Sequence, residues 1–197
     1  NATVIAMALN NDAKALGKDL YYTMTIQYMD EAAARKYNIK PLKILSTFIP
    51  TIDVAPELAV LPGDSICFSD AHSAMTGRIA NTAVFPVLPG RHEFRTTLEK
   101  TGIFEKGGTI HYMGTHMHTF AESMTLVDKT EGRTLWTGYI NQNRAANATS
   151  APDEWYASAE GIKIDPAHAY ELIGVYNNTT AKVIPDAMAM LRIYYSE

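Results

Sequence analysis

HYMGTHMHTF, residues 111–120, contains three of the six histidines of the chain. His116 and His118 are two residues apart, and on a β-strand such residues point to the same face, about 7 Å apart along the strand. A helix does not bring residues i and i+2 together. Alternating residues continue over 121–127 and lead into a polar turn at 128–133, which favours a strand. The pair therefore indicates either two metal-binding imidazoles or two surface histidines.

Turn-forming residues divide the rest of the chain into many short segments rich in β-branched and aromatic residues. Short strands separated by Gly, Pro and Asn turns are typical of an antiparallel sandwich or barrel, so we predict an all-β fold. Helix is expected only in short pieces near residues 11–18 and 30–36, and loops at 70–81 and 141–153. The expected strands are 20–29, 42–49, 57–61, 65–68, 82–87, 91–98, the histidine strand that Gly107 and Gly108 open, 121–127, 134–140, 162–164, 170–176 and 187–195.

Composition excludes several classes of function. With 47% hydrophobic and 19% charged residues, the chain fits an ordinary globular protein, and we expect one domain over residues 1–197. A net charge of −4 offers no basic field for nucleic acid. No apolar run approaches the roughly 20 residues of a membrane helix. Cys67 is the only cysteine, which excludes an internal disulfide.

A metal site needs a third ligand, and two residues are candidates. His111 comes five residues before His116, so a regular strand turns it to the opposite face unless a bulge resets the alternation. Three roles therefore remain open for His111: a further ligand, a residue that supports the ligands, or a buried structural histidine. Met188 lies on the wetter face of the strand expected at 187–195, where it is either a ligand or a gap-filling side chain. The apolar face of that strand is Ala187, Ala189, Leu191, Ile193 and Tyr195.

Five short motifs follow one another in a recognisable order. They are VLPG at 87–90, THMH at 115–118, VYNNT at 175–179, DAM at 186–188 and IYY at 193–195. Their order and spacing resemble the C-terminal domain of the copper type II, ascorbate-dependent monooxygenases, which include peptidylglycine α-hydroxylating monooxygenase and dopamine β-monooxygenase. The resemblance covers residues 82–197. It implies a jelly-roll sandwich and a copper ion bound by His116, His118 and Met188.

The family pattern is incomplete in this chain. The family enzymes carry a second copper in an N-terminal domain, on histidines that include an adjacent His-His pair, and this sequence has no such pair. The remaining histidines, His72, His92 and His168, lack ligand spacing; we expect His92 on a solvated strand and His168 in a turn. The disulfides of the family are impossible with one cysteine. The N-terminal segment, about 80 residues, is too short for the missing domain, and we expect it to complete this one.

The ligand set itself favours copper. Two imidazoles and a thioether suit copper, especially Cu(I), better than zinc, which favours His, Cys or carboxylate ligands. Tyr112 and Gly114 share the face of the two histidines. Because Gly114 has no side chain, it leaves room beside the metal for oxygen, water or a substrate.

Three functions follow from these observations. The first is a copper-binding domain with monooxygenase-like chemistry, whose partners would be a small-molecule or peptide substrate and an external electron donor. The second is a non-catalytic copper protein for storage, delivery or electron transfer. The third is a β-sandwich that binds a partner and whose histidines are structural. The resemblance implies an exported protein, periplasmic or secreted, and a chain that begins at Asn1 is compatible with a cleaved signal.

Overall fold

The computed structural model describes residues 25, 28–49, 84–98, 101–140 and 154–197. The chain divides into two units, Asn1–Lys40 and Pro41–Glu197. Several predicted segments lie outside the described residues, namely the helix near 11–18, the strands 57–61 and 65–68, and the loops 70–81 and 141–153. Most of the predicted strand 20–29 also lies outside them, and its described residues, Thr25, Tyr28 and Met29, are irregular and exposed.

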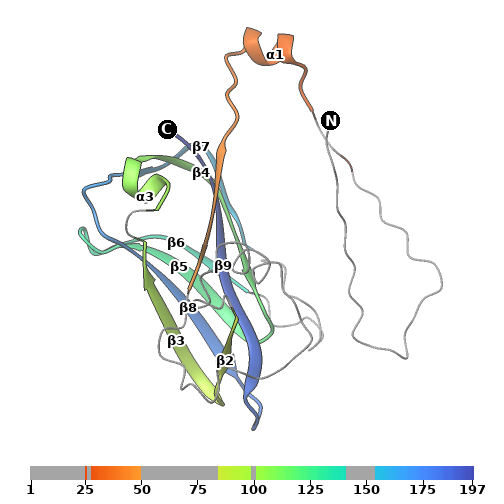
Figure 1. The fold of residues 1–197 in the computed structure, drawn as a ribbon, viewed down its shortest axis with the longest axis vertical. Helices are drawn as coiled ribbons and strands as arrows, with labels where there is room; N and C mark the ends of the chain where they lie inside the picture. The colour runs from red at the N-terminus through yellow and green to blue at the C-terminus, as the bar shows by residue number, and fades with distance from the viewer. Residues whose placement is uncertain (1–24, 26–27, 50–83, 99–100, 141–153) are drawn as a thin grey trace, which may run out of the picture. The chain divides into compact units, whose positions relative to one another are not determined.

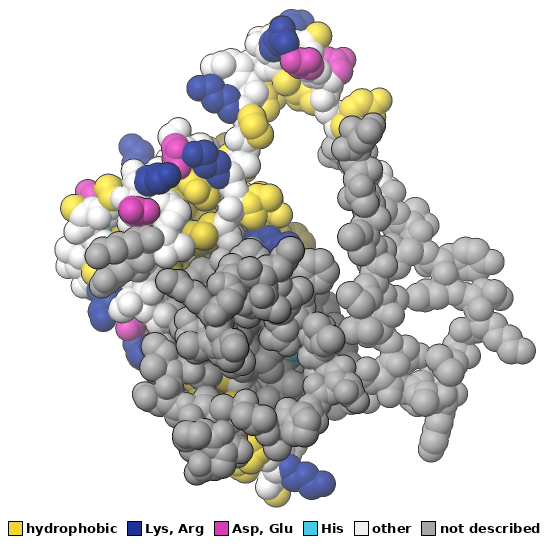
Figure 2. Space-filling model, in the orientation of Figure 1, with side chains coloured by type: hydrophobic (Ala, Val, Ile, Leu, Met, Phe, Trp, Pro, Cys, Tyr) yellow, Lys and Arg dark blue, Asp and Glu magenta, His cyan; other side chains and the backbone are white. Residues whose placement is uncertain are grey.

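The described part of the first unit contains one short helix, α1 (Glu31–Lys36), which confirms the helix expected near 30–36. Asp30 caps it, because its Oδ1 accepts a hydrogen bond from the Ala33 amide at 2.7 Å. Glu31 in the first turn pairs with Arg35 in the last, and Figure 2 shows acidic and basic side chains together on this helix. The acidic residue near the N-terminus and the basic residue near the C-terminus each interact favourably with the helix dipole, and their ion pair also stabilises the helix.

The second unit is an antiparallel β-sandwich of two sheets (Figure 1). The first sheet has the order β1 (Lys43–Phe48), β9 (Ile184–Ser196), β4 (Gly108–Met117) and β7 (Tyr156–Ile164), and β2 (Val84–Val87) pairs with the start of β9. The second sheet has the order β3 (Gly90–Thr97), β8 (Tyr170–Asn178), β5 (Ala121–Asp128) and β6 (Arg133–Tyr139).

The strand order defines a jelly roll. From β2 to β5 the chain changes sheet at each connection, and it does so again from β6 to β9, so that β9 returns between the early strands and β4. The exception is the β5–β6 pair, a hairpin that turns at residues 129–132, as the sequence predicts. The predicted all-β sandwich of jelly-roll type is thus confirmed.

The core lies between the two sheets, and β9 shows how the sequence fills it. Ala187, Ala189, Leu191 and Ile193 are fully buried, which confirms the predicted apolar face. Burying a side chain of the size of Leu or Ile contributes about 1.5–3 kcal/mol. At one end of the core, Phe85 packs at 4.5 Å, centroid to centroid, against Phe94, and Tyr176 meets both rings edge-on.

The opposite end of the core is closed by a helix that the sequence pattern does not predict, α3 (Ile103–Lys106). Ile103 and Phe104 are buried, and the Phe104 ring lies 5.2 Å from that of Tyr170. Four residues are too few to show a helical period, so the helix depends on this burial. Within the described residues, neither helix is long and apolar enough to cross a membrane.

Candidate metal site

The non-core face of β4 and β9 brings together the residues that the sequence singles out. Antiparallel pairing places His116 opposite Met190. Two residues later, the His118 amide donates to the Met188 carbonyl at 3.3 Å, so the ladder continues just past the end of β4. Because alternate residues share a face, the two histidines and two methionines form a continuous group. We call these four residues the His-Met cluster.

The two imidazoles are close enough to act on one ion. Their ring centroids lie 5.3 Å apart and the ring planes are nearly perpendicular, at 85°. Burial lowers the pKa of His116, and the neighbouring charges of His118 and Arg192 lower it further. His116 is therefore a neutral imidazole near pH 7, which is the form that binds metals.

Both methionines of the cluster are candidates for the sulfur ligand. Met188 is 2% exposed, yet among the described residues it is not part of the hydrophobic core cluster that includes Met113, Met117 and Met124. This burial corrects the prediction that Met188 lies on the wetter side of its strand, where Arg192 is exposed and Met190 and Tyr194 are half-buried. Met190, which is half-buried and lies opposite His116, was missed as a candidate by sequence reasoning. The strand register, which the sequence does not contain, is what identifies it.

The space expected above Gly114 is partly filled. A Cβ atom at Gly114 would lie 3.5 Å from ring atoms of Tyr112, so that ring covers the glycine. Tyr194 meets the Tyr112 ring edge-on at 5.4 Å. Arg192, opposite Gly114, is exposed and supplies the positive charge of this face. The glycine thus accommodates a tyrosine ring beside the His-Met cluster.

His111 is the bulge residue of β4. The register of β4 shifts between Ile110 and Tyr112 against both of its neighbours, so the bulge that would reset the alternation is present. The His111 ring nevertheless has both nitrogens engaged: Nδ1 lies 3.1 Å from the Ser158 carbonyl oxygen, and Nε2 lies 2.9 Å from the Ser196 hydroxyl. Because a carbonyl only accepts, Nδ1 is the donor and Nε2 accepts from Ser196. A metal at His111 would have to displace one of these partners.

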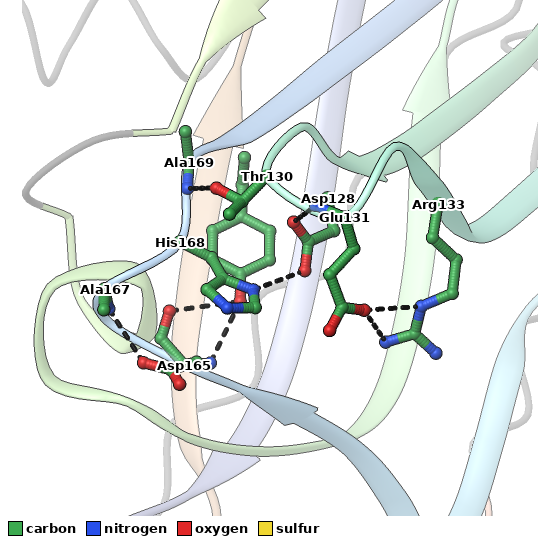
Figure 3. Close-up of polar contacts among 9 residues, drawn as sticks. Asp128, Thr130, Glu131, Arg133, Asp165, Ala167, His168 and Ala169 are labelled. Carbon is green, nitrogen blue, oxygen red and sulfur yellow. Dashed lines mark hydrogen bonds and ion pairs between the residues drawn. The ribbon is translucent and has the colours of Figure 1, made fainter.

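A second polar cluster, missed by sequence reasoning, joins two turns (Figure 3). His168 lies in the turn between β7 and β8, as expected, and its Nδ1 is 2.8 Å from Oδ2 of the buried Asp128. The other Asp128 oxygen accepts from the Glu131 amide at 3.0 Å. The Thr130 hydroxyl accepts from the Ala169 amide at 2.9 Å. These bonds connect the β5–β6 turn to the β7–β8 turn.

The electrostatics of this second cluster are those of an ion pair. The hydrogen bond to Asp128 raises the pKa of His168 against the opposing effect of burial. Burial would raise the pKa of Asp128, but the hydrogen bonds from the Glu131 amide and His168 outweigh it, and the net pKa is lowered. A cavity of about 550 Å³ lies beside the pair, lined by charged residues of both turns and by Gly107, Gly108, Ile164, Pro166 and Tyr170.

In the described part of the chain, Asp128, Glu131 and His168 are the one group of three His, Cys, Asp or Glu side chains whose ligand atoms all lie within 4.8 Å of one another. Their polar atoms already bond to one another, to the protein backbone, and, for Glu131, to Arg133 at 3.1 Å (Figure 3). We therefore interpret this cluster as a connection between the two turns.

No protein-family model matches the chain, and a search of curated proteins finds no relative. The geometry of the His-Met cluster and the motif resemblance of the sequence are the features that point to a function.

Proposed function

We propose that this chain is a copper-binding protein whose mononuclear site consists of His116, His118 and Met188. The observation that carries the proposal is a pair of perpendicular imidazoles at 5.3 Å, with the backbone of Met188 hydrogen-bonded beside them. Two imidazoles and one thioether are a ligand set suited to copper, and to Cu(I) in particular. When bound, copper would exchange single electrons with oxygen or with a redox partner.

The residues around the cluster support this assignment. The neutral state of His116 leaves a ring nitrogen with a lone pair for a metal. His116 and Met188 come from two paired strands of one sheet, and His118 directly follows one of these strands. A rigid element holds ligand geometry better than a loop does. The half-buried position of both histidines leaves one side of the cluster accessible to an electron donor or a small substrate.

The proposed activity is monooxygenase-like and depends on partners. The external electron donor and the small-molecule or peptide substrate are carried over from the family resemblance, as is an exported, periplasmic or secreted location. No second histidine cluster occurs among the residues that the structure describes, since the only three-residue group there is the Asp128 cluster. Because a single copper supplies one electron at a time, the second electron of a hydroxylation would come from outside this site.

Ligand substitutions test the site. Replacing His116 or His118 by Ala should abolish tight copper binding, because each removes one of the three donors. Met188→Ile, similar in volume but without sulfur, should weaken Cu(I) binding by at least about tenfold, or about 1.4 kcal/mol. Cu(II) binding should weaken less, because a thioether is a soft ligand. The measurement is a competition titration of each oxidation state against a chelator of known affinity.

Met190→Ile is the matched control, since Met190 lies on the same strand and face, two residues away. It should leave both affinities close to those of the wild type. Equal loss of Cu(I) and Cu(II) binding in Met188→Ile would show that Met188 only packs. A larger loss in Met190→Ile would transfer the sulfur ligand to that residue. A wild-type chain without copper affinity would favour the β-sandwich with structural histidines.

A further inference from the structure

Tyr176 reaches the His-Met cluster from the other sheet. Its hydroxyl donates to the Met188 carbonyl, and it accepts from the His118 amide at 3.2 Å. The same amide lies 3.3 Å from the Met188 carbonyl, so it is shared between two acceptors. One hydroxyl therefore bonds to the main chain of two of the three proposed copper ligands, His118 and Met188.

The position of Tyr176 is fixed by the core. The residue is on β8, is fully buried, and lies edge-on to the rings of Phe85 and Phe94. These contacts hold the ring rigidly, so the hydroxyl is delivered to one place on the opposite sheet. A buried tyrosine of this kind has a hydrogen-bonded hydroxyl. Because the ring is held in the core, the hydroxyl fixes how far the backbone that it contacts lies from the opposite sheet.

The backbone at this point needs such support. His118 follows the last residue of β4 and begins a turn, in which the Ala121 amide donates to the His118 carbonyl at 3.3 Å and Phe120 has a positive φ of 72°. Without further contacts, a residue beyond the end of a strand is held by the last ladder bond alone. Met188 has a flexible side chain, so the location of its sulfur depends on where its backbone is held.

We propose that Tyr176 is a positioning residue for the copper site, which fixes the separation of His118 and Met188 through its hydroxyl. This inference rests on the proposed function. It makes the sulfur ligand dependent on a residue of the opposite sheet that does not touch the metal. Residues that orient ligands in this way typically change metal affinity by about 10- to 100-fold when they are removed.

Tyr176→Phe tests the proposal, because it removes the hydroxyl and keeps the ring. Tyr170→Phe is a closely matched control on the same strand. Tyr170 is also buried, and its hydroxyl also bridges a backbone pair, accepting from the Asp165 amide at 2.9 Å and donating to the Asp165 carbonyl at 3.1 Å. Both variants lose the same kind of bridge, so general destabilisation affects them alike, whereas only one bridge lies at the His-Met cluster.

Three readouts on the full chain separate positioning from stability. Tyr176→Phe should lower Cu(I) affinity roughly 10- to 100-fold and reduce the copper–sulfur scattering in the X-ray absorption spectrum. In the metal-free protein, it should shift the His118 amide resonance. Tyr170→Phe should leave all three close to wild type. As a measurement without any variant, Cu(I) added to the wild-type chain should shift the ring resonances of Tyr176 more than those of Tyr170.

The outcomes distinguish this inference from the proposed function. If the wild type shows a copper–sulfur contact and Tyr176→Phe matches Tyr170→Phe in Cu(I) affinity and sulfur scattering, the positioning role is wrong and the copper site stands. If the wild type binds no Cu(I), the proposed function fails and the inference fails with it. Equal ring shifts of the two tyrosines on addition of Cu(I) would also overturn the positioning role.

Discussion

At the scale of single residues, the Asp128–His168 pair makes stability depend on pH. The hydrogen bond to Asp128 raises the pKa of His168, so the contribution of His168 is complete below its unfolded pKa of about 6.5 and is lost as pH rises through the higher folded pKa. The pKa of Asp128 is lowered, so its contribution is complete above about pH 4 and is lost as pH falls through the lower folded pKa. The pair therefore stabilises the chain most between about pH 4 and pH 6.5.

His168→Asn measures this effect, because the amide retains a donor near the position of Nδ1 but does not titrate. We expect the wild type to unfold at a higher urea concentration than the variant. The margin, which is the difference between the two unfolding midpoints, should be larger at pH 5.5 than at pH 8.5. In an Asp128→Asn background, the pH dependence of that margin should disappear. A margin that is constant over this range would contradict an ionic contribution.

Gly161 lies at a position where backbone geometry is restrictive. It has a positive φ of 73°, and a Cβ atom there would lie 2.5 Å from the Ile110 carbonyl oxygen. Gly132 has a similar φ of 64°, but a Cβ atom added there would meet no heavy atom within 4 Å. In both alanine variants, holding a residue with a Cβ atom in the left-handed backbone conformation costs about 1–2 kcal/mol. In Gly161→Ala, the Cβ atom also collides with the backbone of Ile110.

We expect Gly161→Ala to be the less stable of the two variants by about 1–3 kcal/mol, the usual cost of overpacking. Chemical denaturation of both variants measures the difference directly. Equal destabilisation would mean that β7 can move away from β4 at this point without cost.

At the scale of the strand, the bulge at His111 decides which way the histidines point. Ile110 is buried, and strict alternation from it would turn Gly114 and His116 into the core. The one-residue shift instead buries Met113, Thr115 and Met117 and leaves His116 on the outer face. The bonds from His111 to Ser158 and Ser196 hold the bulge in place. His111 thus supports the orientation of the proposed ligands without being near enough to form a three-histidine group with them in the described structure.

At the scale of the whole molecule, the sandwich offers one proposed copper site, and this limits its chemistry. A mononuclear site supplies one electron at a time, whereas hydroxylation consumes two electrons from the donor. We expect the isolated chain, given copper, ascorbate and oxygen, to release hydrogen peroxide without hydroxylating glycine-extended peptides or phenethylamines. Oxygen uptake, peroxide and product are measured together.

The His116→Ala variant is the control for this assay, since it removes a ligand from the site while free copper and ascorbate remain. If the wild type forms no more peroxide than the His116→Ala variant, the peroxide comes from free copper and not from the protein. Stoichiometric, copper-dependent product from the wild type would show that one copper suffices, and would make the chain a monooxygenase in its own right.

The sequence by itself determined the features that depend on neighbouring residues. The two-residue period of β9 predicts its core face, the polar run at 128–133 predicts the β5–β6 hairpin, and the short strands predict a sandwich. The spacing of His116 and His118 predicts a shared face, because that is a local property of a strand. α3 was not predictable, because its four residues are helical only through burial of Ile103 and Phe104.

The tertiary structure alone decided what joins distant parts of the chain. The bulge at His111, the pairing of Met190 with His116, the Asp128–His168 pair and the Tyr176 hydroxyl all depend on register or on contacts between sheets. Tyr176 is 58 residues from His118, and His168 is 40 residues from Asp128. No periodicity encodes such contacts, because a shift of one residue in the pairing leaves every local pattern intact while it changes which side chains meet.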